Sequence, residues 1–321
     1  MIGRGRGATP RRCAPPLPVL DNPATRCANS ATGFSCGPRG SGGGHPNRSG
    51  RSDSSSPRRT RTKSGTHQHR QTTGSRFAGT PPFPGGNTMT TSQITSVSAA
   101  LYDARRIVPG DPEWPDQLDQ LEPPVTQLWV TGTANLHDVL TTSITICGAR
   151  ASTSYGNHVT TQIAHDLAEE GWTVAIGGSF GIDAAATRGA LSARNAPTVI
   201  VAPCGLNIIH PTAHANLYAG VLAAGGLIVS EYDPDARPVK AAHQRRSQLL
   251  GVLTGGVVMV EAAQRTGSKA TVHAAEAIGA PVFAVPGPVT SSVSHYPHEL
   301  IRDGRAALIT SAADIMEEYG N

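Results

Sequence analysis

Six short apolar runs, separated by segments with helical spacing, constrain the fold of this 321-residue chain more than any other feature. They cover residues 143–147, 173–176, 198–202, 226–230, 257–260 and 281–285. Each run is apolar on both faces, which is typical of a strand in a parallel sheet covered by helices on either side. The alternation of these runs with helices predicts an α/β fold with a doubly wound, mostly parallel sheet.

The segment between the first two runs has clear helical spacing. Val159, Ile163 and Leu167 recur at i, i+4 and i+8, and Gly171 can end that helix at its C′ position. Residues 141–321 are numerous enough to bury a core of their own, and sheets of this kind bind ligands at the carboxyl ends of their strands. Residues 89–140 are few and rich in proline, so we expect a short N-terminal subdomain packed on the main domain.

The first 88 residues differ from the rest in charge and composition. They hold 14 of the 27 Lys and Arg residues and only two acidic residues, a net charge of +12, whereas the remaining 233 residues carry 13 basic and 21 acidic residues, a net charge of −8. Residues 1–88 are rich in Gly, Pro, Ser and Arg and contain no Trp or Tyr. Such a segment cannot bury enough apolar surface to offset the entropy of ordering, so we expect a disordered basic tail.

Three interpretations of this tail are open. It is a basic arm that contacts nucleic acid, a solvated linker, or sequence that is not translated because synthesis begins at Met89. We favour the third, because an organised segment begins just after Met89 and the tail shows no patterning. The tail lacks the apolar core of a secretory signal, and the chain has no apolar run of about 18 residues, so we expect neither export nor a membrane span.

The cysteines and histidines indicate neither a disulfide framework nor a metal site. Three of the five cysteines lie at irregular spacing in the tail, and Cys147 and Cys204 lie at the ends of apolar runs, which favours a reducing, cytoplasmic location. His210 and His214 are four residues apart, but Pro211 interrupts the helix that would align them. We expect no metal, no cofactor and no catalytic residue.

The loop after the first run has the composition of a phosphate site. Gly148, Arg150 and Ser152 lead into the first helix, whose N-terminal N–H groups favour an anion, and the planar guanidinium of an arginine suits phosphate. The segment is not the dinucleotide fingerprint G-x-G-x-x-G. The alternative is a tight strand-to-helix turn with Arg150 in solvent.

The loop after the second run is rich in glycine. Its candidate site residues are Gly177, Gly178, Ser179 and Gly181, and Asp183 is expected to cap the following helix. The same residues match the G-x-S-x-G pattern of serine hydrolases, with Ser179 as the nucleophile. We disfavour that alternative because no oxyanion segment precedes it and the chain offers only loop residues as partners.

Two further loops carry cations next to helix N-termini. After the fourth run come Lys240, His243, Arg245 and Arg246, and after the fifth come Gly267, Ser268 and Lys269. Cations at a helix N-terminus oppose the macrodipole, which indicates that an anion balances them. A solvated charge cluster is the alternative. Four such loops at one edge of a parallel sheet predict an extended polyanion or nucleotide site.

From about residue 112 to residue 317 the chain resembles the DNA-processing protein A family, also called DprA or Smf. The resemblance rests on Trp114-Pro115, Glu122-Pro123-Pro124, the loop at 148–156, Gly181-Ile182-Asp183, Gly189-Ala190-Leu191, Cys204-Gly205-Leu206, Ser230-Glu231-Tyr232, Val260-Glu261-Ala262, Thr266-Gly267-Ser268, the segment 283–287 and the segment 300–304. It implies an extended Rossmann-like domain that binds single-stranded DNA without being an enzyme. It also implies a homodimer that helps to load the RecA recombinase during natural transformation and recombination.

Some family positions are occupied by other residues here. The family's Arg-Asn-Arg motif reads Arg246-Ser247-Gln248, and His243 stands where the family has a phenylalanine. Loss of an arginine and an aromatic ring removes a charge and a base-stacking surface, so the affinity for DNA is expected to be weaker or differently placed. No winged-helix segment follows residue 321 in this sequence, and the family's front helical domain is nearly absent.

A phosphoribohydrolase-like, nucleotide-processing enzyme is the alternative function. Enzymes of that class have a similar sheet and a Pro-Gly-Gly-x-Gly-Thr-x-x-Glu segment, whereas Glu261 here lacks the Gly-Thr loop. The binding function requires a local arrangement rather than a global charge, because the part of the chain after residue 88 is acidic. The cations of the predicted loops must gather at one edge of the sheet; they are Arg150, Lys240, Arg245, Arg246 and Lys269.

Overall fold

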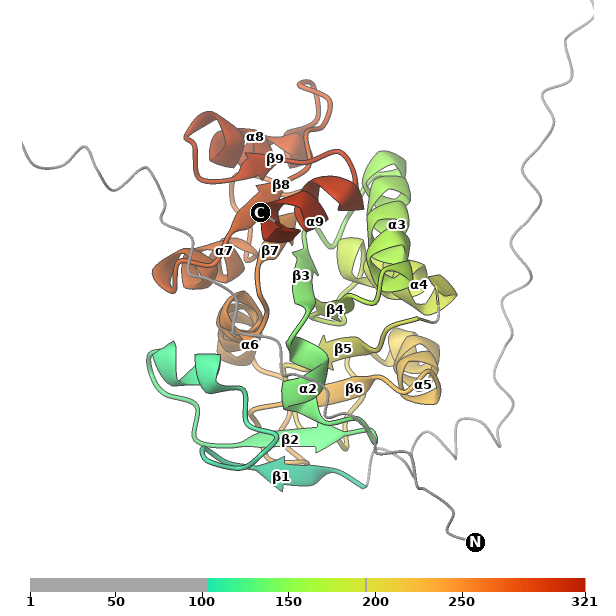
Figure 1. Ribbon diagram of the computed structural model, residues 1–321, viewed down its shortest axis with the longest axis vertical. Helices are drawn as coiled ribbons and strands as arrows, with labels where there is room; N and C mark the ends of the chain where they lie inside the picture. Colours follow the sequence, from blue (N-terminus) through green and yellow to red (C-terminus); the bar gives the residue numbers. More distant parts are fainter. Residues whose placement is uncertain (1–102, 194, 321) are drawn as a thin grey trace, which may run out of the picture. The chain divides into compact units, whose positions relative to one another are not determined.

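The structure is a computed structural model that describes residues 103–193 and 195–320 (Figure 1). The predicted tail and residues 89–102 lie outside the described residues. The strands are β1 (Arg105–Ile107), β2 (Leu128–Thr131), β3 (Ser143–Cys147), β4 (Thr173–Ile176), β5 (Thr198–Val201), β6 (Leu227–Ser230), β7 (Val257–Met259), β8 (Val282–Ala284) and β9 (Ala307–Leu308). The α-helices are α2 (Leu136–Leu140), α3 (Ser154–Glu169), α4 (Ile182–Ala193), α5 (Ala215–Ala223), α6 (Lys240–Leu253), α7 (Lys269–Ala277), α8 (His295–Arg302) and α9 (Ala312–Gly320). Short 3-10 helices lie at η2 (Asp116–Gln120), η3 (Thr212–His214) and η4 (Ser292–Ser294).

The strands form one sheet in the order β1-β2-β6-β5-β4-β3-β7-β8-β9. The seven neighbouring strands β6-β5-β4-β3-β7-β8-β9 pair in parallel. Strand β2 pairs antiparallel with β6 on one side and with β1 on the other. The chain moves from β3 outward to β6 and then returns to the other side of β3 at β7. The predicted doubly wound, mostly parallel sheet is confirmed, and its topological switch point lies between β3 and β7, where open α/β sheets bind ligands.

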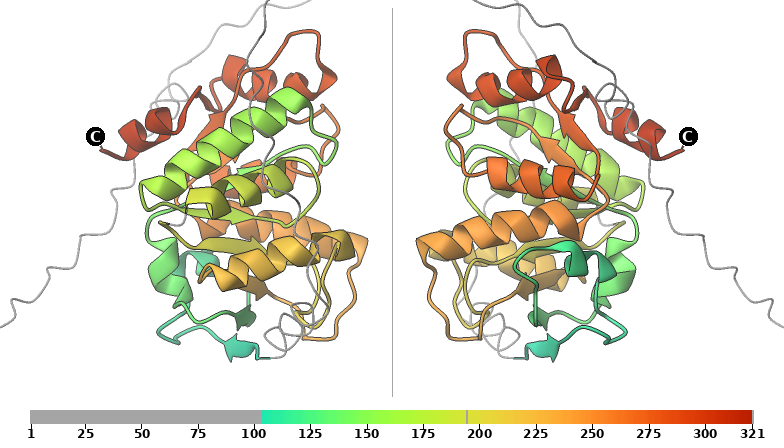
Figure 2. Two further views of the ribbon diagram at one scale, coloured as in Figure 1. Left: turned by 90° about the vertical axis from the view of Figure 1, so that its right-hand side faces the viewer. Right: turned by 90° about the vertical axis from the view of Figure 1, so that its left-hand side faces the viewer.

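Helices cover both faces of the sheet. Figure 2 shows α3, α4 and α5 over one face and α6 and α7 over the other. The two-residue period of the strands explains how one strand serves both layers: Ile200 of β5 packs in the cluster that contains α3 and α4 residues, whereas its neighbours Val199 and Val201 pack in the cluster of α6 residues. All three side chains are fully buried, as an apolar run without alternation predicts.

The predicted helix between the first two strands is confirmed as α3. Ile163 and Leu167 are buried in its apolar stripe, and Thr153 caps its start by accepting a hydrogen bond from the Gly156 N–H at 3.1 Å. Gly171 follows the end of the helix with φ of 83°, the left-handed conformation expected at C′.

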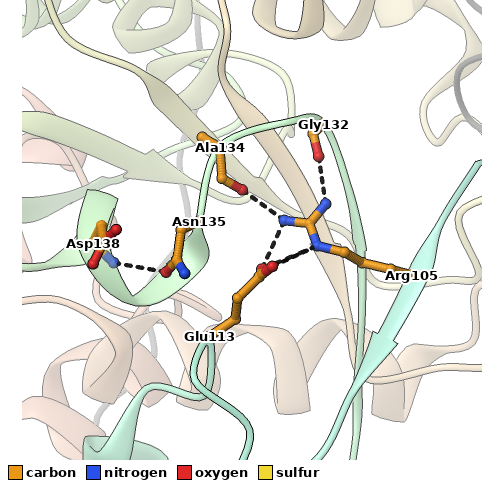
Figure 3. A network of polar contacts seen from close by, with 6 residues as sticks. All are labelled: Arg105, Glu113, Gly132, Ala134, Asn135 and Asp138. Atoms are coloured by element: carbon orange, nitrogen blue, oxygen red, sulfur yellow. Dashed lines mark hydrogen bonds and ion pairs between the residues drawn. The ribbon is translucent and has the colours of Figure 1, made fainter.

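The segment before β3 adds two strands to the sheet. Arg105 on β1 fixes its path, because the guanidinium donates to both carboxylate oxygens of Glu113, to the Ala134 carbonyl at 2.6 Å and to the Gly132 carbonyl (Figure 3). Asn135 then caps α2 by accepting a hydrogen bond from the Asp138 N–H at 3.1 Å. A single side chain thus joins β1, the turn before η2 and the turn after β2.

None of the helices within the described ranges is both long enough and apolar enough to cross a membrane.

The Arg105 contacts predict a measurable contribution to stability. Arg105→Ala should lower the free energy of unfolding by about 1–2 kcal/mol, because it removes several charge-assisted hydrogen bonds from a partly exposed site. The neighbouring Arg106 is exposed and, among the described residues, donates only to Gln127, so Arg106→Ala should change stability by less than about 0.5 kcal/mol. Urea denaturation of the three chains measures the difference; equal midpoints for both variants would contradict the prediction.

Candidate functional site

A pocket of about 800 Å³ opens at the switch point, between the loops after β3, β4 and β7 and the first turns of α6 and α7. Nine of the fourteen predicted site residues line it: Gly148, Arg150, Ser179, Lys240, His243, Arg246, Gly267, Ser268 and Lys269. Ser152 and Gly181 line a smaller pocket beside it. Gly177 and Gly178 lie beneath the first pocket, where they contact Arg246 and Tyr218.

The loop after β3 and the glycine loop after β4 are packed backbone to backbone. The Ile182 N–H donates to the Ala149 carbonyl at 3.1 Å. Gly181 has φ of 74°, and a Cβ atom there would lie 2.2 Å from the same carbonyl oxygen. Only glycine fits this position, for both conformational and steric reasons. The two loops are therefore held as one rigid unit.

The N-terminus of α3 is occupied by a carboxylate of the chain itself. Glu261, which follows β7 and is 3% exposed, accepts hydrogen bonds from the Thr153 N–H at 2.8 Å and from the Thr153 hydroxyl at 2.5 Å. Its backbone carbonyl accepts from the Ala149 N–H at 2.6 Å. The sequence predicted that this helix N-terminus would receive a ligand phosphate; in the structure, Glu261 already satisfies the donors of Thr153 and balances the positive end of the helix.

Arg246 of α6 lies on the floor of the pocket and is 8% exposed. Its guanidinium donates to the Gly177 carbonyl at 2.6 Å and to the Ser179 hydroxyl at 3.1 Å, and its Nε has no hydrogen-bond partner among the described residues. Burial lowers the pKa of Arg246, and the nearby Asp183 opposes that shift. Arg246 thus supports the glycine loop through the Gly177 carbonyl and the Ser179 hydroxyl, while its Nε is buried without a partner among the described residues.

Asp183 does not cap α4 as predicted. It lies inside the first turn, where its carboxylate accepts the Ser179 N–H at 3.0 Å, and it is 6% exposed. Burial raises the pKa of this carboxyl group, whereas Arg246 lowers it. The glycine loop is therefore hydrogen-bonded to two buried side chains, the carboxyl group of Asp183 and the guanidinium of Arg246.

The structure directs Arg245 away from the pocket. Its guanidinium binds both carboxylate oxygens of Glu231, at 2.8 and 3.0 Å, and donates to the Pro123 carbonyl at 2.6 Å. Its side chain is only 12% exposed. Among the described residues, Arg245 is the one predicted cation that forms a close, bidentate ion pair with a carboxylate, that of Glu231.

Three other cations around the pocket lack a carboxylate partner. Arg150, Lys240 and Arg265 are exposed, and none of them lies within ion-pair distance of a carboxylate in the described residues. Lys269 lies 3.8 Å from Glu299 and above the Tyr296 ring. Sequence reasoning missed Arg265, although it directly precedes the predicted Thr266-Gly267-Ser268 loop.

The pKa of His243 reflects its burial and the positive charges around this pocket. Its Nδ1 lies 3.4 Å from the Arg150 guanidinium. Burial, together with Arg246, Arg150 and His210, lowers the pKa of the imidazole to about 4, so the ring is neutral at pH 7. Arginines that disfavour a cation at this position favour an anion at the same position.

The contacts of Ser179 and Glu261 bear on the enzyme alternatives. The side chain hydrogen-bonded to the Ser179 hydroxyl is Arg246, and a guanidinium cannot serve as the general base that a serine nucleophile needs. The Glu261 carboxylate is buried and engaged by Thr153. No group of three or more His, Cys, Asp or Glu side chains could hold a metal ion within residues 103–193 and 195–320.

The sequence of this chain is similar to those of known DNA processing proteins. A putative DNA processing protein DprA from Mycobacterium tuberculosis is 41% identical over 194 residues, which cover 60% of this chain and 49% of that protein. The chain thus spans about half the length of this curated relative.

Two solved structures show the same fold. DNA processing protein A from Streptococcus pneumoniae has a TM-score of 0.61 and 29% identity, covering 70% of this chain and 77% of the other. DNA processing protein A from Helicobacter pylori, whose structure is described as giving insight into a unique single-stranded DNA binding mode, has a TM-score of 0.59 and 27% identity, covering 67% and 96%.

The model of the family described as DNA recombination-mediator protein A matches residues 105–320, from the first strand of the sheet to the last helix. This match covers every loop of the pocket, and the chain therefore belongs to the DNA recombination-mediator protein A family.

Proposed function

We propose that this protein binds single-stranded DNA in the pocket at the switch point of its sheet. The observation that carries the proposal is the gathering of Arg150, Lys240 and Arg265 around one pocket without carboxylate partners among the described residues. The H. pylori relative with the same fold is described as a single-stranded DNA binder. A polyanion is the ligand that such a cluster fits best.

We assign different roles in DNA binding to the residues that line the pocket. Arg150 offers a planar fork for a phosphate, and the exposed side chains of Lys240 and Arg265 supply two further positive charges to the same pocket. The rigid loops below them bring backbone groups close to the ligand, and Arg246 holds those loops in place. Contacts of this kind read the phosphate chain rather than the base sequence, so binding should be largely independent of sequence.

Membership of the family supports a proposal for the wider role of the protein. We propose that it acts in the cytoplasm, as a homodimer, and assists the loading of RecA on single-stranded DNA during DNA uptake and recombination. It would do so as a binding protein, without a cofactor. The phosphoribohydrolase-like enzyme remains the second candidate, but the engagement of Glu261 by Thr153 disfavours it.

The proposal predicts the effect of removing Arg150. Arg150→Ala should weaken the binding of all single-stranded sequences by a similar factor, about tenfold, because it removes one charge-assisted phosphate contact. The slope of log affinity against log salt should become less steep by about 0.7. Fluorescence anisotropy with labelled oligonucleotides at several salt concentrations measures both quantities.

Arg106→Ala is the matched control, because Arg106 is also exposed, does not line the pocket and lies on the edge strand β1. It should leave affinity and slope unchanged. Chains with and without residues 1–88 should both show the Arg150 effect, since the described residues that line the pocket all follow residue 146. Absence of DNA binding, together with release of free base from nucleoside monophosphates, would show that the enzyme is the correct function.

His243 predicts a pH dependence. A bound phosphate favours the imidazolium, so it should raise the pKa of His243 above its value of about 4, and affinity should increase as the pH falls from 7 towards 5. NMR titration of the histidine ring protons, with and without oligonucleotide, measures the shift. His243→Asn should remove this part of the pH dependence, whereas His158→Asn, at an exposed site on α3, should retain it. An identical His243 pKa in the free and bound protein would contradict the prediction.

A further inference from the structure

A second pocket, of about 280 Å³, lies on the other side of Arg150. It is formed by the loop after β3, the first turn of α3 and the N-terminal half of α4. The residues that matter for its chemistry are Arg150, Phe180, Arg188 and His214. Arg150 lines both pockets, so the two adjoin at this side chain.

Phe180 is the unusual feature of the second pocket. It lies in the glycine loop between Gly178 and Gly181, both with positive φ, and its side chain is 49% exposed. A half-exposed phenylalanine forgoes a substantial part of the burial free energy that its side chain could contribute. Within this pocket the ring offers an apolar surface on which a planar group of a ligand can stack.

The Phe180 ring is supported from behind. The imidazole of His214 meets it edge to face, with ring centroids 4.5 Å apart at 64°. His214 itself is 6% exposed, and its Nδ1 lies 3.0 Å from the Gly178 carbonyl. The support leaves about half of the phenylalanine accessible in a fixed orientation, as a stacking surface requires.

The electrostatics of the second pocket favour an anionic ligand. Arg188 projects from α4, one turn after Ala184, and is exposed. Neither Arg188 nor Arg150 forms an ion pair with a carboxylate of the described residues, and no acidic residue lines this pocket. The pocket thus combines an aromatic face with two unneutralised cations, which is the composition of a site for an unpaired base and its flanking phosphates.

We propose that this second pocket is a base-stacking subsite for single-stranded DNA, with Phe180 as the stacking surface and Arg188 as the phosphate contact. The strand would continue from the first pocket across Arg150. The inference rests on the proposed function of the first pocket and extends it. The subsite supplies an aromatic surface in a chain in which the family's phenylalanine is replaced by His243.

Oligonucleotide length tests the proposal in the full chain. Oligothymidylates of about 4 and about 16 nucleotides distinguish a ligand that fills one pocket from one that spans both. Phe180→Ala should weaken binding of the long oligonucleotide by about 5- to 100-fold and leave the short one unchanged. Val289→Ala, at a site that is 89% exposed and lines neither pocket, is the matched control.

A second variant gives a direct signal of stacking. The three native tryptophans are buried or partly buried, so the indole of Phe180→Trp adds an exposed fluorophore. Its fluorescence should be quenched saturably by the long oligothymidylate.

The outcomes separate the two proposals. If the wild type binds neither oligonucleotide, the proposed function fails and the subsite fails with it. If Lys240→Ala weakens binding of both lengths but Phe180→Ala changes neither affinity, and Phe180→Trp shows no quenching, the first pocket stands and the subsite is overturned. Length-dependent loss with Phe180→Ala, together with quenching, supports the subsite.

Discussion

The structure of the site depends on one buried carboxylate. Glu261 lies at the switch point of the sheet and joins its two halves, because its carboxylate binds Thr153 at the start of α3 while its carbonyl binds Ala149. The same residue neutralises the helix end that faces the crevice. With that charge supplied internally, we propose that an external anion is recognised by side chains that line the pocket, above all Arg150, Lys240 and Arg265.

A pocket in an acidic domain can be positive because several cations elsewhere are paired with carboxylates, whereas most of those around the pocket have no such close partner among the described residues. Away from the pocket, Arg105, Arg245 and Arg305 form close ion pairs with Glu113, Glu231 and Glu276. Pairs of this kind cancel locally and contribute little to the field at a distance. The cations that remain without a carboxylate among the described residues therefore determine which surface attracts a polyanion, and several of them lie at the switch point.

The strands of the sheet could be predicted where burial on both faces left an apolar run. β3 and β4 were predicted with their observed bounds, and β5 to β8 to within one residue at each end. The predictions missed β1, β2 and β9. Strands β1 and β9 have only three and two residues, which is too few to carry a periodic signal, and β2 follows a proline-rich segment. The meeting of the predicted loops at one pocket could be anticipated because parallel strands bring their carboxyl ends to one edge of the sheet. The pairing of Arg245 with Glu231 and Pro123 could not be predicted, because these partners are brought together only by the fold.

The backbone contact between Gly181 and Ala149 has a consequence for how fast a ligand is captured. Because the two loops are locked together, and Arg246 and Asp183 hold the glycine loop from both sides, the crevice exists before any ligand arrives. A preformed crevice loses little conformational entropy on binding and imposes no rearrangement step. The association rate is then governed by diffusion and by the long-range field of the unpaired cations, and differences in affinity between ligands arise mainly from how quickly each one dissociates.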